Sequence, residues 1–201
     1  MKPTHIFTDL GGVLLTNGWD RALRRRVTEH FKIDTAEMDE RHHLTYDTYE
    51  SGKIDLPTYL NRIIFYEQRP YTQSQVVDFI FDQAKALTET IDLVKELKAR
   101  HGVKLGVVSN EGRELGEDRV RRFKLHEFID FFVISGCVGL RKPDRAIFQL
   151  ALDMAQVKGD QVAYLEDRKM FADLAADFGL RSVWHRDAAT TRAALAAMGL
   201  D

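Results

Sequence analysis

Short apolar segments alternate with longer amphipathic patterns along most of this chain, and this alternation restricts the fold more than any other feature. An apolar run near the N-terminus ends at Asp9, and four similar segments follow: 104–109, 131–135, 161–166 and 181–185. Helical patterns precede or follow these segments: 88–100, 112–124, 143–155, 168–178 and 188–198. Because strands that alternate with helices pair in parallel through right-handed crossovers, the pattern predicts an α/β fold with a doubly wound, parallel, five-stranded sheet.

Residues 16–86 interrupt the alternation. This stretch predicts four helices, over residues 19–31, 35–49, 56–67 and 73–86, with turn residues between them. We therefore expect a Rossmann-like core made of residues 1–15 and 87–201, with an all-helical cap of residues 16–86 inserted after the first strand. Long insertions after strand ends usually cover or shape a binding site, so the cap is expected to contribute to a site at that edge of the sheet.

The composition excludes several classes of protein. Lys and Arg number 29 against 31 Asp and Glu, a net charge of -2, which gives no support to nucleic-acid or membrane-surface binding. The N-terminus lacks the pattern of a signal peptide, and the longest apolar stretch, residues 131–140, is too short to cross a bilayer. Cys137 is the only cysteine and has apolar sequence neighbours, so we expect a small buried residue and no Cys-based zinc site. A cytoplasmic location is the expectation.

Polar residues stand where the predicted strands end. They are Asp9 with the glycines that follow it, Ser109 with Asn110, Lys142 in the loop after the third strand, and Glu166 with Asp167. The carboxyl ends of parallel strands meet at one edge of a sheet, where ligands bind in open α/β folds. Each residue alone could instead cap a helix or face solvent, and Pro143 suits the first turn of the helix after Lys142. The ordered set favours a ligand site.

These residue types suit phosphoryl transfer. Asp9 and Asp167 offer the hard oxygen ligands that Mg²⁺ prefers. Lys142 and the Ser109 hydroxyl offer a positive charge and a hydrogen-bond donor to phosphate oxygens, and backbone N–H groups of the glycine pair 11–12 can add donors. A carboxylate nucleophile held beside a cation is suited to forming an aspartyl-phosphate.

The motifs at residues 9–13, 109–110, 139–144 and 165–167 resemble those of the haloacid dehalogenase superfamily of hydrolases, in the branch with a helical cap after the first strand. The Asp-Leu-Gly-Gly-Val variant resembles sugar-phosphate phosphatases and β-phosphoglucomutase. The resemblance implies an Asp9 nucleophile, with Ser109 and Lys142 as catalytic partners. It also implies a phosphate site formed by Leu10, Gly11, Ser109, Asn110 and Lys142. It further implies a Mg²⁺ site formed by Asp9, the Gly11 carbonyl, Glu166 and Asp167.

Two positions depart from the family pattern. Most phosphatases of the family carry a second aspartate two residues after the nucleophile as general acid and base, and here that residue is Gly11. Loss of such an acid forfeits roughly 10²–10⁴ in rate. Either the substrate has a good leaving group, or a cap residue supplies the proton, for which the candidates are His42, His43 and Tyr46. Phe171 is the second departure, because Gly, Asn or Asp is usual there.

The sequence therefore favours a Mg²⁺-dependent phosphatase that acts on a small phosphorylated metabolite, with a sugar phosphate as the favoured substrate. Two alternatives stay open: a non-catalytic member that binds a phosphorylated metabolite, and a metal-free 2-haloacid dehalogenase, which the paired carboxylates 166–167 disfavour. Arg21, Arg24 and Arg25 share one predicted helix face, either as a solvated surface or as a positive rim that attracts the substrate. The substrate itself and the oligomeric state are not determined by the sequence.

Overall fold

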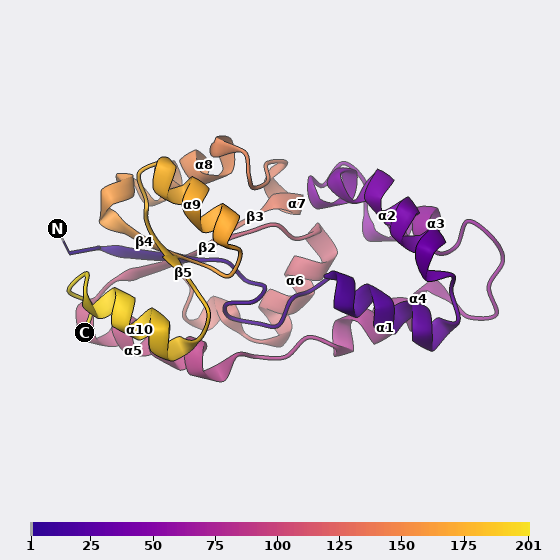
Figure 1. Cartoon of the computed structure of the whole chain (residues 1–201), viewed down its shortest axis with the longest axis horizontal. Helices are drawn as coiled ribbons and strands as arrows, with labels where there is room; N and C mark the ends of the chain where they lie inside the picture. The colour runs from indigo at the N-terminus through magenta and orange to yellow at the C-terminus, as the bar shows by residue number, and fades with distance from the viewer. Residues whose placement is uncertain (1) are drawn as a thin grey trace.

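A parallel β-sheet forms the centre of the computed structural model, which describes residues 2–201. Within these residues five strands pair in the order β3-β2-β1-β4-β5 (Figure 1). Their bounds are β1 His5–Thr8, β2 Lys104–Ser109, β3 Phe131–Ile134, β4 Val162–Glu166 and β5 Arg181–Trp184. All neighbouring strands run parallel, so the predicted doubly wound sheet is confirmed.

Helices cover both faces of the sheet. On one face α5 (Thr88–His101), α6 (Arg113–Arg122) and α10 (Ala188–Ala196) pack against side chains such as Ile6, Leu105 and Leu165. On the other face α8 (Arg145–Ala155) and α9 (Lys169–Asp177) pack against Phe7, Val108 and Tyr164. Because apolar side chains leave both faces of every central strand, both faces must be covered, which explains why the strands read as continuous apolar runs.

Four helices lie together at the other end of the molecule (Figure 1). They are α1 (Arg21–Phe31), α2 (Thr35–Glu50), α3 (Leu56–Ile63) and α4 (Gln73–Asp82). Each begins after a side chain that accepts a hydrogen bond from the first turn: Asp20, Asp34, Asp55 and Thr72. Their apolar faces form a separate hydrophobic cluster, which Leu115 of α6 joins.

The loop regions differ from the sequence expectations at two points. Asp144 caps α8, so Pro143, whose peptide bond with Lys142 is cis, precedes the helix instead of occupying its first turn. A short helix, α7 (Ser135–Val138), follows β3 where the pattern predicted none, and it places Cys137 on the surface. The buried Gly136 faces inward and donates its N–H to the Glu111 carbonyl, which leaves Cys137 on the outer side.

Two 3₁₀ helices complete the chain, η1 (Leu125–Glu127) and η2 (Gly159–Gln161). None of the helices formed by residues 2–201 is both long and apolar enough to span a membrane.

Candidate active site

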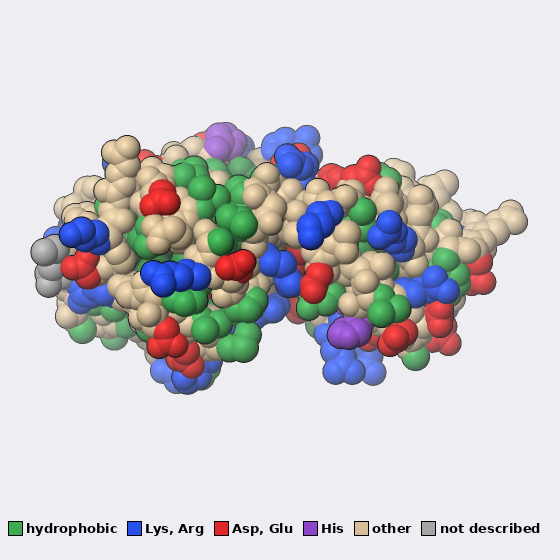
Figure 2. Space-filling view, turned by 90° about the horizontal axis from the view of Figure 1, so that it is seen from above, with side chains coloured by type: hydrophobic (Ala, Val, Ile, Leu, Met, Phe, Trp, Pro, Cys, Tyr) green, Lys and Arg blue, Asp and Glu red, His purple; other side chains and the backbone are tan. Residues whose placement is uncertain are grey.

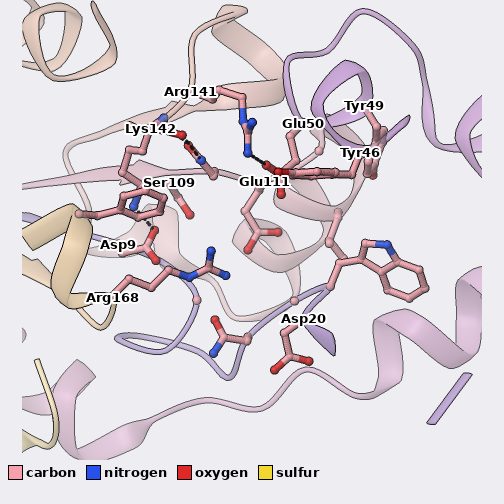
Figure 3. Close-up of a pocket in the computed structure, with 18 of the residues that line it drawn as sticks. Asp9, Asp20, Tyr46, Tyr49, Glu50, Ser109, Glu111, Arg141, Lys142 and Arg168 are labelled. Atoms are coloured by element: carbon pink, nitrogen blue, oxygen red, sulfur yellow. Dashed lines mark hydrogen bonds and ion pairs between the residues drawn. The ribbon is translucent and has the colours of Figure 1, made fainter. Parts of the chain in front are cut away.

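A cavity of about 500 Å³ opens where the carboxyl edge of the sheet meets α1 and α2 (Figure 3). The space-filling view shows the molecule narrowing between its two parts, with acidic and basic side chains near the junction (Figure 2). Asp9, Ser109 and Lys142 line the cavity from the sheet side. Thr8 of β1 pairs with Val107 of β2 and Leu165 of β4, which brings the ends of these strands level.

Lys142 lies at the centre of the charged groups on the sheet side. Its side chain is 1% exposed, and its Nζ lies 3.0 Å from Asp9 Oδ1, 2.6 Å from Glu166 Oε2 and 3.1 Å from the Tyr164 hydroxyl. Burial by itself lowers the pKa of Lys142, but the negative charges of Asp9 and Glu166 outweigh it and raise the pKa above its usual range. The ammonium group is therefore a fixed positive charge beside Asp9.

Asn110 holds the loop that carries Lys142. Its Oδ1 accepts a hydrogen bond from the Lys142 backbone N–H at 2.7 Å, and its Nδ2 donates to the Lys142 carbonyl at 2.8 Å. Both ends of the amide thus bond backbone groups of Lys142 and fix its position. The Nδ2 group has a second hydrogen and Asn110 lines the cavity, so its part in phosphate binding stays a prediction. The Leu10 side chain is buried in the core and does not line the cavity, so any contact of Leu10 with phosphate would come from its backbone, and that role stays a prediction.

Phe171 acquires a physical role that the sequence did not indicate. Its ring is 7% exposed and lines the cavity, with its centroid 5.3 Å from Lys142 Nζ and 5.8 Å from the Arg168 guanidinium carbon. The ring covers Lys142 from solvent and contributes cation–π attraction, which is about 2 kcal/mol or more when the cation is desolvated. The aromatic residue therefore stabilises the charge that faces Asp9.

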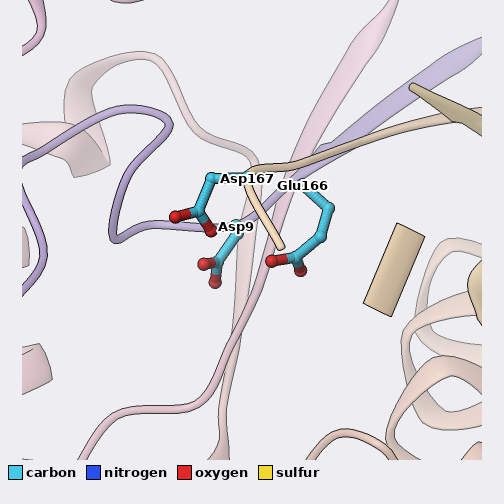
Figure 4. A group of neighbouring side chains, drawn as sticks. All are labelled: Asp9, Glu166 and Asp167. Atoms are coloured by element: carbon cyan, nitrogen blue, oxygen red, sulfur yellow. The ribbon is translucent and has the colours of Figure 1, made fainter. Parts of the chain in front are cut away.

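Three carboxylates gather beside Lys142 (Figure 4). One ligand oxygen each from Asp9, Glu166 and Asp167 lies within 4.8 Å of the others. Glu166 is engaged at both oxygens, by Lys142 and the Tyr164 hydroxyl at Oε2 and by the Arg168 N–H at Oε1. Burial and the charge of Asp9 raise the pKa of Glu166 to about 7, although Lys142 lowers it. Glu166 is therefore the partner of Lys142 more than a free metal ligand.

Asp167 supplies an oxygen that fits a divalent cation. Its Oδ1 is buried and has no hydrogen-bond partner among residues 2–201, which leaves this oxygen available as a metal ligand. Gly12, at φ +75°, lies so close that a Cβ there would overlap the Asp167 carboxylate. Two hard carboxylates, Asp9 and Asp167, with the neighbouring backbone of Gly11, form a donor set that suits Mg²⁺.

The cap-side candidates for the missing acid fare differently. His42 and Tyr46 line the cavity, whereas His43 is exposed and lies outside it. His42 stacks on Tyr46, and its Nδ1 lies 2.5 Å from the Tyr59 hydroxyl. Burial, with help from Arg24, lowers the pKa of His42 to about 4. The imidazole is therefore neutral at pH 7 and is a weak source of protons.

The three arginines predicted to share one face of α1 differ in whether they line the cavity. Arg21 and Arg24 line the cavity, but Arg25 does not. Its Nε lies 3.9 Å from Glu29 Oε1, and most of its side chain is exposed. Arg24 is held by Asp39 at 3.0 Å and by the Trp19 carbonyl. Only part of the predicted positive rim faces the cavity.

Three groups at the site were not indicated by the sequence. Arg141, next to Lys142, forms ion pairs with Glu50 and Asp47 of α2 and so joins the loop that carries Lys142 to the helical part. The second and third, Glu111 and Arg119, form an ion pair that is nearly inaccessible to solvent. Glu111 stands two residues after Ser109, which is a positional signal, but nothing in the sequence pairs it with Arg119.

The chain is similar to hydrolases of known sequence and structure. The family model described as "Haloacid dehalogenase-like hydrolase" matches residues 23–184. Pyrimidine 5'-nucleotidase YjjG of Escherichia coli (strain K12) is 36% identical over 163 residues, which cover 77% of this chain and 72% of that protein. Haloacid dehalogenase-like hydrolase domain-containing protein 3 of Bos taurus is 43% identical over 68 residues, which cover 34% of this chain and 27% of that protein.

A HAD family enzyme of Bacteroides thetaiotaomicron shares the fold. Its structure superposes with a TM-score of 0.78 at 18% identity, covering 93% of this chain and 95% of that chain. The same enzyme in complex with magnesium and inorganic phosphate has a TM-score of 0.76 at 19% identity, covering 92% and 95%.

Proposed function

The chain belongs to the haloacid dehalogenase-like hydrolase family, and on this premise we propose that it is a Mg²⁺-dependent phosphatase that works through an aspartyl-phosphate on Asp9. The observation that carries the proposal is the position of Lys142, whose buried ammonium lies 3.0 Å from Asp9 Oδ1, while an Asp167 carboxylate oxygen also lies within 4.8 Å of an Asp9 oxygen. A nucleophilic carboxylate flanked by a cation and a metal-binding carboxylate is suited to attack on phosphorus.

Each residue has one task in the proposed reaction. The phosphoryl group enters the cavity in line with Asp9, and an oxygen of Asp9 attacks phosphorus. Lys142 balances the charge on the phosphoryl oxygens, and the Ser109 hydroxyl and the Gly11 N–H donate hydrogen bonds that fix their direction. Mg²⁺, held by Asp9, the Gly11 carbonyl and Asp167, would neutralise further charge on the transferred group.

The lining of the cavity supports a proposal for the substrate class. The helical part contributes polar and charged side chains, among them Asp20, Arg24, Tyr46 and Glu50. Such groups offer hydrogen bonds to a hydroxyl-bearing molecule, which favours a small phosphorylated metabolite such as a sugar phosphate. We propose that residues 16–86 act as the cap that selects this metabolite. The nucleotidase named above supports a phosphorylated substrate in general.

Phosphate release from a panel of sugar, nucleotide and acyl phosphates tests the proposal. Turnover should require Mg²⁺, stop in EDTA, and fall by at least about 10³ in Asp9→Asn, because the amide is not a nucleophile. Asp173→Asn, on the exposed face of α9, is the matched control and should keep full activity. Folded wild-type protein that binds phosphate but turns over no member of the panel would instead indicate a binding protein. Halide release from a 2-haloacid without Mg²⁺ would indicate a dehalogenase.

A further inference from the structure

Glu111 presents a carboxyl group to the same cavity. It follows the end of β2, lines the cavity, and is 5% exposed (Figure 3). Arg119 of α6 donates a hydrogen bond to its Oε1, but its Oε2 has no hydrogen-bond partner anywhere in the described part of the chain. A buried carboxyl oxygen without a partner is costly, so its retention at a cavity wall points to a partner on the bound substrate.

The pair formed by Glu111 and Arg119 stands beside the loop that follows Asp9. A Cβ built on Gly11 would lie 3.8 Å from Arg119 Nη1, and a Cβ built on Gly18 would lie 3.0 Å from Glu111 Oε2. Arg119 also donates a hydrogen bond to the Thr16 carbonyl, which anchors the same loop. Glu111 therefore reaches the cavity next to the position where residue 11 has no side chain of its own.

The surroundings of Glu111 allow it to exchange a proton near neutral pH. Burial, together with the charges of Asp9 and Glu50, raises its pKa to about 7, although the Arg119 guanidinium lowers it. Burial raises the pKa of the Tyr49 phenol of α2 well above its usual value, and the charges of Glu114 and Glu111 raise it further. A carboxyl group with a pKa near 7 can both give and take a proton at pH 7.

Hydrolysis of an alkyl phosphate requires such a group. When Asp9 attacks phosphorus, the bond from phosphorus to the leaving oxygen breaks, and an alkoxide is a poor leaving group unless a proton reaches it. We propose that Glu111 is a catalytic acid and base of this enzyme, which donates the proton from Oε2 to the leaving oxygen. This inference rests on the proposed phosphatase activity.

The second half of the reaction returns the proton. Water attacks the phosphorus of the aspartyl-phosphate, the bond between phosphorus and the Asp9 oxygen breaks, and Glu111 accepts one proton of the attacking water. Inorganic phosphate and a free Asp9 carboxylate result, and Glu111 is protonated again. Each proton given in the first step is thus recovered in the second.

Glu111→Gln separates this role from the rest of the reaction. In single-turnover experiments with Mg²⁺, phosphorylation of the enzyme by an alkyl phosphate should slow by about 10²–10⁴-fold, because the amide carries no exchangeable acid proton. Phosphorylation by p-nitrophenyl phosphate, whose leaving group needs no proton, should slow by less than about fivefold. Hydrolysis of the phosphoenzyme should slow with both substrates. Glu117→Gln, on the exposed side of α6, is the matched control.

The pH dependence gives an independent readout. In the wild type, phosphorylation by the alkyl phosphate should fall as pH rises through about 7, and hydrolysis of the phosphoenzyme should rise over the same range. Glu111→Gln should remove both limbs. If Glu111→Gln does not fold, as judged by circular dichroism, Glu111→Asp keeps the charge opposite Arg119 and should lower the alkyl rate at least about tenfold.

The outcomes separate the two proposals. Suppose that the wild type is a phosphatase that depends on Mg²⁺ and Asp9. If the Glu111→Gln variant then keeps the rate with the alkyl phosphate and the wild-type pH profile, the role of Glu111 is overturned and the proposed function stays intact. The same holds for Glu111→Asp if Glu111→Gln does not fold. A wild-type protein that forms no phosphoenzyme with either substrate would overturn the proposed function first. Selective loss with the alkyl phosphate supports both.

Discussion

Replacing Lys142 tests whether its buried charge holds the site together. Lys142→Met keeps most of the side-chain volume but leaves two carboxylates, Asp9 and Glu166, without the cation that lies 3.0 Å and 2.6 Å from them. Removing one partner of a buried ion pair typically costs about 3–5 kcal/mol. We expect the free energy of unfolding at pH 8, without metal, to fall by that amount.

The loss of unfolding free energy in Lys142→Met should be smaller at pH 6 than at pH 8. Burial and Asp9 already raise the pKa of Glu166 to about 7, and loss of the opposing charge of Lys142 should raise it further. A carboxyl whose pKa is raised by folding stabilises fully below its unfolded pKa and loses that contribution as pH rises through the folded value. From pH 8 to pH 6 the variant should therefore recover about 1.4 kcal/mol relative to the wild type.

Urea denaturation at pH 6 and pH 8 measures both effects. Lys169→Met is the control, since Lys169 forms its ion pair with Asp173 at a distance of 2.7 Å but in solvent. An exposed pair of this kind contributes less than about 1 kcal/mol, with no marked change over this pH range. A loss in Lys142→Met no larger than in Lys169→Met, or an equal loss at both pH values, would refute the reasoning.

Three further perturbations test neighbouring features. Gly12→Ala should abolish the rise in melting temperature on adding Mg²⁺, because its Cβ would overlap the Asp167 carboxylate that we propose as a Mg²⁺ ligand. Gly139→Ala, at a similar φ but with open space around it, should keep that rise. Arg141→Met should lower the free energy of unfolding by about 1–2 kcal/mol and raise the KM for the phosphorylated substrate, through loss of its ion pairs to α2; an unchanged KM would contradict the link. Adding Gly11→Asp to Glu111→Gln should restore alkyl phosphate turnover at least about tenfold, because residue 11 would then supply a carboxyl group. The loop should accept the change, since a Cβ at Gly11 would lie closest to the flexible Asn17 side chain, with Oδ1 at 2.9 Å. No gain in a folded double variant would count against this prediction.

The layers of the fold and the order of the polar groups could be predicted because they depend on local patterns. β2 begins and ends at the predicted residues, 104 and 109. Its apolar run lies between a helix that ends at a glycine and a polar turn, and such a run is typical of a strand that is buried in a parallel sheet. Asp9, Ser109 and Lys142 were placed together because the carboxyl ends of parallel strands share one edge. Nothing beyond strand order and helix period was needed for either inference.

Side-chain partnerships depend on distant packing and required the tertiary structure. Asn110 bonds to the backbone of Lys142, 32 residues later, because two loops meet at the sheet edge. Glu111 meets Arg119 because α6 turns one face back over the loop after Asp9, and neither residue type predicts a buried pair.

The tertiary structure also decides which side chains are exposed to solvent. Cys137 lies on the surface although its sequence neighbours are apolar, because the inner side of α7 is taken by Gly136.

The alternation of apolar and polar residues along this chain determines the sheet and the edge at which the carboxylates gather. Which charges are paired, which are buried and which still hold a proton at neutral pH is set by contacts between distant segments, because desolvation and Coulomb interactions depend on distance in space and not along the chain.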